Sequence, residues 1–285
     1  MADPELPFGA KTIRASSLPT WPDCERRWVA VHRRALLAGA GFTTNTRVTH
    51  IGAHVGSSAH AGVGHGWLEL GKTGSLPPMD YAKDVAVETL RERVKAEGVM
   101  FDDTTPDLNN AELAAHKIIV AYREHMDLGT RAILVEQFMA GRVTPGSDWY
   151  LTGHCDAYMD PEERFDDLKT GVRQPSPIIQ VGGYNWLGQT RALRAKRSTM
   201  TFCRRVRRTA DQPPPLVRDI PPALAVRLAK QTVAEIVTKV ETFENATSPD
   251  PLVFRANPSS TLCTNKYCPA FHTRWCPESM LKPEE

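Results

Sequence analysis

Three charged side chains between residues 153 and 171 have the types and the spacing for chemistry on a phosphodiester bond. Asp156 and Asp167 can hold a hard divalent cation through their carboxylate oxygens. Lys169 can position an attacking water molecule and offset the charge of a phosphate group. This combination predicts a nuclease site that uses Mg²⁺ or Mn²⁺.

The elements around these residues are expected to bring the two carboxylates together. The segment 148–159 is rich in strand formers, 160–163 is a cluster of turn residues, and 164–170 forms a second short strand. This order predicts a β-hairpin. The hairpin places Asp156 beside Asp167.

The remaining side chains of the set follow from local periodicity. Within 167–169, the period of two along a strand puts both charged side chains on one face and turns Leu168 toward the core. The dipeptide 176–177 predicts a helix start, with a serine N-cap and a proline at the first helical position. Gln180 and Tyr184 are four residues apart and share one face of that helix.

Taken in order, these residues resemble the PD-(D/E)XK nuclease superfamily, and specifically its RecB-like branch. In that branch, two acidic positions and a lysine are followed by a helix with a Q-x-x-x-Y motif. The segment 55–60 is similar to the upstream motif of the branch, a glycine-led helix that ends in a metal-binding histidine. Glu136 matches a strand glutamate that often precedes the first aspartate.

The resemblance implies a role for each residue of the set. The expected metal ligands are His60, Asp156, Asp167 and the backbone carbonyl of Leu168. Lys169 would assist the attacking water molecule. Gln180 and Tyr184 would steady the site and the DNA backbone.

Each part of this set also has a structural alternative. A D-x-K triplet is common on any solvated strand, and His60 lies in a histidine-rich stretch with His50, His54 and His65. The occurrence of all these residues in this order favours a nuclease site over a chance arrangement of surface residues. Cys155, beside the first aspartate, is expected to be a small buried residue and not a ligand.

The six cysteines of the chain give a second signal. No apolar segment typical of secretion occurs near the N-terminus. We therefore expect a cytoplasmic location and no disulfide framework. Cys263, Cys268 and Cys276 form a tight cluster of soft ligands. Clustered thiolates select iron–sulfur clusters or zinc.

The segment 17–28 resembles the start of the iron–sulfur members of the same branch, which include AddB-type helicase–nuclease subunits and CRISPR-adaptation exonucleases. In these proteins one N-terminal cysteine joins three C-terminal ones around a [4Fe-4S] cluster. The resemblance implies that the ligands here are Cys24, Cys263, Cys268 and Cys276. The spacing is C-x4-C-x7-C where the family usually has C-x2-C-x5-C, and Glu25 stands where a proline is usual. Zinc, with His272 as a further ligand, and a site without metal are the alternatives.

Length and element order predict a single elaborated domain, because the cysteine site would join its two ends. We expect a mainly helical section over 18–130, a catalytic core over 131–210, and a C-terminal helix with the cysteine tail over 216–285. The expected helices are 18–37, 56–70, 80–96, 110–126, 177–193 and 222–244. The expected strands are 132–140, 148–159, 164–170 and 198–207. This order predicts an α/β fold with a mixed sheet flanked by helices, and the resemblance implies a PD-(D/E)XK (restriction-endonuclease-like) core.

The formal net charge of +2 is too small to indicate a nucleic-acid partner, but basic residues are concentrated in two segments of the sequence. One group follows the predicted helix and consists of Arg191, Arg194, Lys196, Arg197, Arg204, Arg205, Arg207 and Arg208. A second group near Cys24 consists of Arg26, Arg27, Arg33 and Arg34. Contacts with DNA phosphates are expected here, with a charged and solvated strand edge as the alternative.

The segment 66–73 fits the G-x-x-x-x-G-K-T pattern of a phosphate-binding loop letter for letter. That motif must follow a buried strand and open a helix, whereas here a helical pattern precedes it and a glycine- and proline-containing segment follows. We therefore interpret the segment as the C-terminus of a helix with a glycine stop. No intrinsic ATPase activity is expected.

The sequence thus predicts a metal-dependent deoxyribonuclease, an exonuclease acting on single-stranded DNA or DNA ends, with a structural [4Fe-4S] cluster. No membrane span is expected. The alternative is a non-catalytic DNA-end-binding or adaptor subunit with protein partners in a recombination or integration assembly. A restriction-type endonuclease is a third hypothesis, for which no sequence-reading element is identified.

Overall fold

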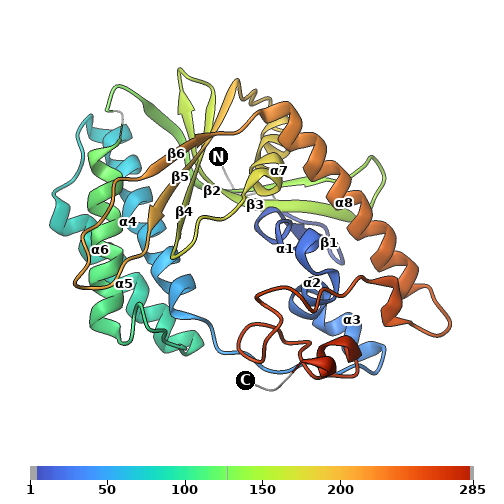
Figure 1. Ribbon diagram of the computed structural model, residues 1–285. Coiled ribbons are helices and arrows are strands. Elements are labelled where there is room, and N and C mark those ends of the chain that lie inside the picture. Colours follow the sequence, from blue (N-terminus) through green and yellow to red (C-terminus); the bar gives the residue numbers. More distant parts are fainter. Residues whose placement is uncertain (1–4, 127, 283–285) are drawn as a thin grey trace.

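A six-stranded mixed sheet forms the centre of the molecule (Figure 1). The computed structural model describes residues 5–126 and 128–282. The strands are β1 Lys11–Arg14, β2 Arg131–Arg142, β3 Trp149–Asp160, β4 Arg164–Gly171, β5 Arg197–Arg204 and β6 Leu216–Asp219. They follow the order β1-β3-β4-β5-β6, with β2 paired to β3 off this path. The expectation of an α/β fold with a mixed sheet is confirmed.

Helices cover both faces of this sheet (Figure 1). They are α1 Thr20–Asp23, α2 Glu25–His32, α3 Arg34–Gly39, α4 Ile51–Thr73, α5 Met79–Glu97, α6 Leu108–Glu124, α7 Ile178–Gln189 and α8 Pro222–Glu244. Apolar side chains of α4, α5 and α6 share one core with Leu168 of β4. Those of α2, α7 and α8 share the other with Cys155 of β3. The sheet therefore separates two apolar cores.

The hairpin and the helices α5, α6 and α8 were predicted to within a few residues, but the helix expected over 18–37 was wrong. It is broken at Cys24, which adopts extended backbone angles, and again at Arg33. Cys24 lies near Cys268 of the C-terminal tail. A contact with so distant a segment cannot be predicted from local helical periodicity. Strands β1 and β6 were not predicted because each is four residues long.

Two helix boundaries bear on the site. Helix α4 begins at Ile51, well before the predicted start, and ends at Thr73 with Gly74 in the left-handed conformation at φ 75°. The glycine stop after the phosphate-loop-like segment is therefore confirmed. Helix α7 begins at Ile178 with Pro177 in the N-cap position, so the prediction that Ser176 is the N-cap was wrong.

The C-terminal tail after α8 consists of turns and two short 3₁₀ helices, Pro251–Val253 and Pro277–Leu281. It lies beside α2 and α3 at the N-terminal end of the chain (Figure 1). Within the described residues, no helix has the length and apolar character that crossing a membrane requires.

Candidate functional site

The candidate site forms where the sheet forks. β3 pairs with β1 over 149–152 and with β4 over 157–159, while β2 pairs along its other edge. In the part of the chain that the structure describes, residues 153–156 of β3 therefore have no ladder partner on the side between β1 and β4. Asp156 uses this gap, because its Oδ2 accepts a hydrogen bond from the backbone amide of Leu168 in β4 at 2.7 Å.

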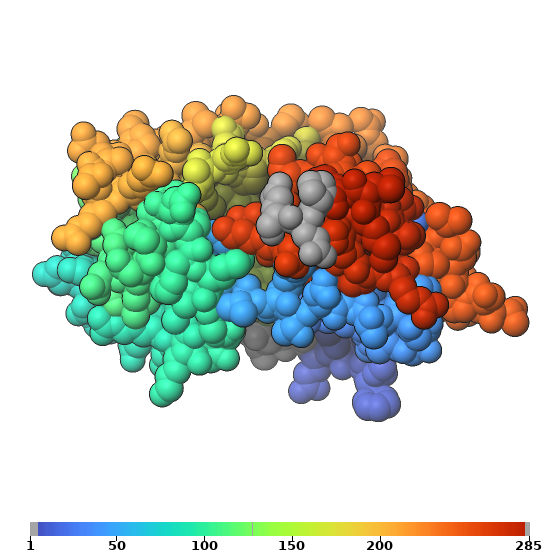
Figure 2. Space-filling model, turned by 60° about the horizontal axis from the view of Figure 1, so that its bottom comes forward, coloured from blue at the N-terminus to red at the C-terminus, as the bar shows by residue number. Residues whose placement is uncertain are grey.

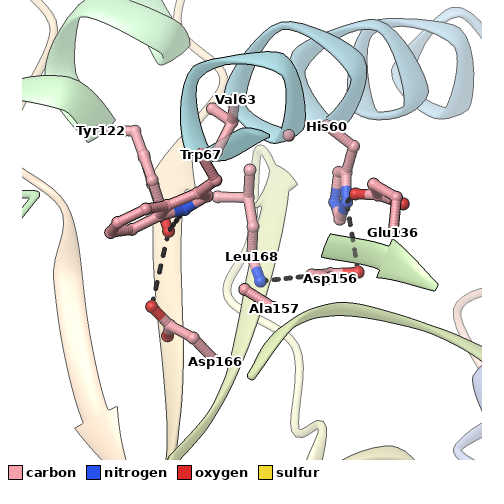
Figure 3. A pocket seen from close by; sticks show the side chains of 10 residues that line it. His60, Val63, Trp67, Tyr122, Glu136, Asp156, Ala157, Asp166 and Leu168 are labelled. Carbon is pink, nitrogen blue, oxygen red and sulfur yellow. Dashed lines mark hydrogen bonds and ion pairs between the residues drawn. The ribbon is translucent and has the colours of Figure 1, made fainter. Parts of the chain in front are cut away.

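Three potential metal ligands converge at this fork. The ligand atoms of His60, Glu136 and Asp156 all lie within 4.8 Å of one another. His60 Nδ1 is 3.4 Å from a carboxylate oxygen of Glu136 and 3.4 Å from one of Asp156. Figure 3 shows His60 pointing from α4 toward the two carboxylates on β2 and β3. A mixed nitrogen and oxygen donor set of this kind suits a divalent cation such as Mn²⁺ or Mg²⁺.

The second carboxylate and the lysine lie together on β4, as predicted. Lys169 Nζ donates to Oδ1 of Asp167 at 2.7 Å. From α7, Gln180 Nε2 contacts the same oxygen at 3.4 Å and donates to the hydroxyl of Tyr184 at 2.7 Å. Leu168 turns into the opposite core, with 3% of its surface exposed. The role of its carbonyl as a metal ligand stays a prediction.

One atom of this group lacks a partner among the described residues. Oδ2 of Asp167 is buried and accepts no hydrogen bond from them. A buried, unpaired carboxylate oxygen costs free energy, so such an atom is usually explained by an ion or a water molecule. The residues present therefore fit a bound cation beside Asp167.

The electrostatics of the site follow from burying several charges together. Burial and the neighbouring Asp156 raise the pKa of Asp167 above its usual value, although Lys169 opposes them. Burial lowers the pKa of His60, but the carboxylates of Asp156 and Glu136 outweigh it and raise that pKa well above the usual range. The proton on His60 and the charge of Lys169 thus balance the carboxylates. A divalent cation could take over that role.

Glu136 reaches this position through a strained backbone. Its φ is 46°, in the left-handed region that non-glycine residues seldom adopt. The β2–β3 ladder runs from Val135–Ala157 to Gln137–Cys155 without a Glu136–Asp156 pair. A conformation of this kind costs about 1–3 kcal/mol and is concentrated at functional sites. The sequence pattern assigned Glu136 to a motif but not to a role.

A buried acid outside the predicted set anchors β4 behind the site. Asp166 accepts hydrogen bonds from Thr199 at 2.6 Å and from the hydroxyl of Tyr122 at 3.4 Å. Figure 3 shows Asp166 and Tyr122 on the far side of Leu168 from His60. Burial raises the pKa of Asp166. The contacts tie β4 to β5 and α6, and so fix the strand that carries Asp167 and Lys169.

The four predicted cysteine ligands, Cys24 near one end of the chain and Cys263, Cys268 and Cys276 near the other, are all buried. Burial, together with the nearby thiols of Cys24, Cys276 and Cys263, raises the pKa of Cys268 to about 12. Cys155 and Cys203 lie in the two apolar cores on opposite faces of the sheet. The core of Cys155 also contains Cys263, Cys268 and Cys276, so the assignment of the four ligands stays a prediction.

The basic group near Cys24 was partly misassigned. Arg26 and Arg27 are 1% and 6% exposed and cannot contact DNA phosphates. Arg26 pairs with Glu278 and donates to the carbonyl of Phe254, so it holds the tail in place. Burial raises the pKa values of Cys276 and Cys263. The charge of Arg26 opposes this effect at Cys276, and the charges of Lys282 and Arg27 oppose it at Cys263.

The other basic group is also divided. Arg205 is buried against Asp102, and Arg197 and Lys196 pair with carboxylates. Arg204, Arg207 and Arg208 are exposed, so they stay candidates for phosphate contacts. The prediction was thus wrong for Arg205, because a buried guanidinium with an acidic partner serves packing.

No protein-family model and no curated protein matches this chain. Among solved structures, the chain is similar to the crystal structure of SSO0001, with 13% sequence identity over 71% of this chain and 83% of that chain. The TM-score is 0.27. A likeness at this level carries no argument about fold or function.

Proposed function

We propose that this chain is a divalent-metal-dependent deoxyribonuclease with a PD-(D/E)XK core of the RecB-like type, and that it acts on single-stranded DNA or DNA ends. The observation that carries the proposal is the group of His60, Glu136 and Asp156, whose ligand atoms lie within 4.8 Å of one another, together with the Asp167–Lys169 pair on the neighbouring strand β4. The buried, unpartnered oxygen of Asp167 supports it, because that atom requires a cation or a water molecule.

The residues of the site would have three different roles in this reaction. A bound Mg²⁺ or Mn²⁺ polarises the phosphodiester and activates water. His60, Glu136, Asp156 and Asp167 would hold the metal. Lys169 orients the attacking water and offsets the developing charge on phosphate. Gln180 contacts Asp167 directly, so it keeps that carboxylate oriented.

We further propose that Cys24, Cys263, Cys268 and Cys276 hold a structural [4Fe-4S] cluster. Four buried thiols from opposite ends of the chain form a soft donor set, and Arg26 and Arg27 supply positive charge beside it. A cluster with four thiolate ligands carries net negative charge, which these buried guanidinium groups would offset. Zinc is the alternative occupant of the same residues.

The direct test is cleavage of end-labelled single-stranded and duplex DNA with Mn²⁺ or Mg²⁺, using protein purified without oxygen. Asp167→Asn and Lys169→Ala should each lower the cleavage rate at least about 100-fold. Asp148→Asn, which removes an exposed charge from the β2–β3 turn, should have no effect. EDTA should stop the reaction.

Two outcomes would overturn the proposal. Wild-type cleavage rates in Asp167→Asn protein would remove the activity from these residues. DNA-end binding without cleavage under any metal condition would favour the non-catalytic adaptor.

A further inference from the structure

An open groove lies on the molecule between the cysteine tail and the segment that precedes α4. Its volume is about 680 Å³, and its lining residues are Thr46, Arg47, Val48, Val99, Met100, Asn265 and Lys266. Figure 2 shows the face on which the tail (red), the segment before α4 (light blue) and the green α5–α6 region meet. The groove is separate from the metal site and is not used by the proposed chemistry.

Backbone hydrogen bonds hold the walls of this groove in place. The amide of Asn45 donates to the carbonyl of Pro269 at 2.8 Å, and its side chain donates to the carbonyl of Phe271 at 2.8 Å. On the other wall, the amide of Met100 donates to the carbonyl of Thr49 at 2.9 Å. The groove is therefore built before any ligand arrives, which lowers the entropy cost of binding.

The charges that face the groove are positive. Arg47 and Lys266 line it directly. Asp102, two residues after the lining residue Met100, is paired with Arg205, whose Nη1 donates to Oδ1 of Asp102 at 3.0 Å. Glu97 is paired with Arg93 at 2.9 Å. The surface therefore complements an anionic chain.

A partly exposed aromatic ring, that of Tyr267, follows the lining residue Lys266 in the chain and is not itself part of the groove lining. Tyr267 is 38% exposed, and its ring centroid lies 5.7 Å from that of His50. Lys266 Nζ lies 5.3 Å from the same ring. Cations alternating with exposed aromatic rings are the usual surface for single-stranded nucleic acid, in which bases stack and phosphates meet the charges.

The segment that lines one wall of the groove leads into the helix that carries His60. Helix α4 begins at Ile51, directly after His50, and carries His60 nine residues later. At 1.5 Å per residue, the two points are about 14 Å apart along the helix axis. The groove and the metal site are therefore joined by the first turns of one helix.

We infer that this groove binds the single-stranded DNA chain on which the metal site acts, with a base stacked on Tyr267 and backbone phosphates against Arg47 and Lys266. The inference rests on the proposed function for the identity of the ligand. It assigns the tail a direct part in substrate binding.

Binding can be measured without cleavage, by the fluorescence anisotropy of labelled oligothymidylate about 12 nucleotides long in EDTA. Tyr267→Ala should weaken binding roughly tenfold, and Tyr267→Phe should retain it, because stacking needs the ring and not the hydroxyl. Lys266→Glu should weaken binding and reduce its salt dependence. Tyr81→Ala is the matched control, since Tyr81 is also exposed and also contacts a histidine ring, at 4.8 Å from His65.

Because Tyr267 and Lys266 lie between two cysteines, each variant should be checked for an unchanged metal content and thermal midpoint. Val48→Glu provides a test outside the tail. Val48 lines the groove with 50% of its surface exposed, so the added carboxylate should repel the strand and weaken binding at least as much as Lys266→Glu.

The outcomes separate this inference from the proposed function. Unchanged affinity in Tyr267→Ala, Lys266→Glu and Val48→Glu would overturn the groove while leaving cleavage to be judged by Asp167→Asn. Equal competition by duplex DNA would overturn the preference for a single strand. Weakened binding in these variants of a protein that does not cleave would support the groove and reject the nuclease.

Discussion

At the scale of single residues, the candidate site contains several buried charges of opposite sign that balance one another. Glu136, Asp156 and Asp167 bring three carboxylates to one fork, against a protonated His60 and Lys169. Like charges at this distance oppose ionisation, and removal of one balancing group leaves another buried and unpaired. The strained backbone of Glu136 is consistent with a position maintained for its carboxylate.

The first prediction concerns His60 and Glu136, the two proposed metal ligands nearest Asp156. His60→Ala and Glu136→Gln should each weaken Mn²⁺ binding at least about tenfold, measured by titration calorimetry, and should slow cleavage in parallel. His65→Ala is the control, because His65 lies on the same helix but contacts Tyr81 instead of the carboxylates. Equal effects of His60→Ala and His65→Ala would return His60 to a structural role.

At the scale of elements, the position of α7 decides where Gln180 and Tyr184 lie. A Cβ atom on Gly182 would lie 2.0 Å from the carbonyl oxygen of Ala225, so α7 crosses α8 in direct backbone contact. The ring of Tyr184 packs on Gly153 of β3 in the same way. Gly182 and Gly153 thus allow α7 to pack closely against α8 and against β3 at the fork.

The second prediction follows from this contact. Gly182→Ala should destabilise the protein by about 1–3 kcal/mol, measured by chemical denaturation, because the two backbones must separate to admit a methyl group. It should also lower activity, since α7 carries Gln180. Gly39→Ala is the control: Gly39 ends α3, and a methyl group added there would meet no atom of the described residues within 4 Å. Similar losses in both variants would contradict the close-contact argument.

The third prediction concerns His32 at the end of α2. Burial, together with Arg33 and Arg14, lowers its pKa from 6.5 to about 4. Between these values the unfolded chain binds a proton that the folded chain does not, so this residue's contribution to stability falls as the pH falls through the window. His32→Phe keeps a ring beside Trp28, 5.3 Å away, and removes the titration.

Thermal midpoints of the wild type and His32→Phe should therefore be compared at about pH 4.5 and 7.5. The variant should gain stability relative to the wild type at the lower pH. A difference between the two proteins that is independent of pH would contradict the assignment.

At the scale of the whole molecule, the cysteine site and its surroundings fasten the two ends of the chain together. Trp275 donates from its indole to the carbonyl of Arg26 at 3.0 Å, and Glu25 accepts from the amide of Arg255 at 2.8 Å. Trp28, Phe243, Phe254 and Trp275 belong to the apolar core beneath this site. A metal bound by Cys24 and the tail would add to these contacts a link across most of the sequence.

The fourth prediction tests this link. Cys24→Ser and Cys263→Ser should lose absorbance near about 400 nm together with bound iron and sulfide, and should unfold at a midpoint lower by about 10 °C or more. Cys203→Ala should keep both colour and metal, because Cys203 lies in the other core. A colourless wild-type protein with stoichiometric zinc would replace the cluster by zinc.

The sequence by itself determined the local geometry of the candidate site. The hairpin, the shared face of Asp167 and Lys169 and the spacing of Gln180 and Tyr184 all follow from periods of two and 3.6 residues, which act between near neighbours. The glycine stop after α4 could be predicted for the same reason. The four cysteines were selected through a resemblance, and all four are buried.

The tertiary structure decided what depends on distant parts of the chain. The pairing of β1 with β3 opens the gap that Asp156 fills, and Cys24 breaks a helical pattern to reach the tail. Arg26 and Arg27 look like exposed charges in the sequence, yet the tail buries them. Burial and long-range pairing arise only when remote segments pack together, so no local pattern can specify them.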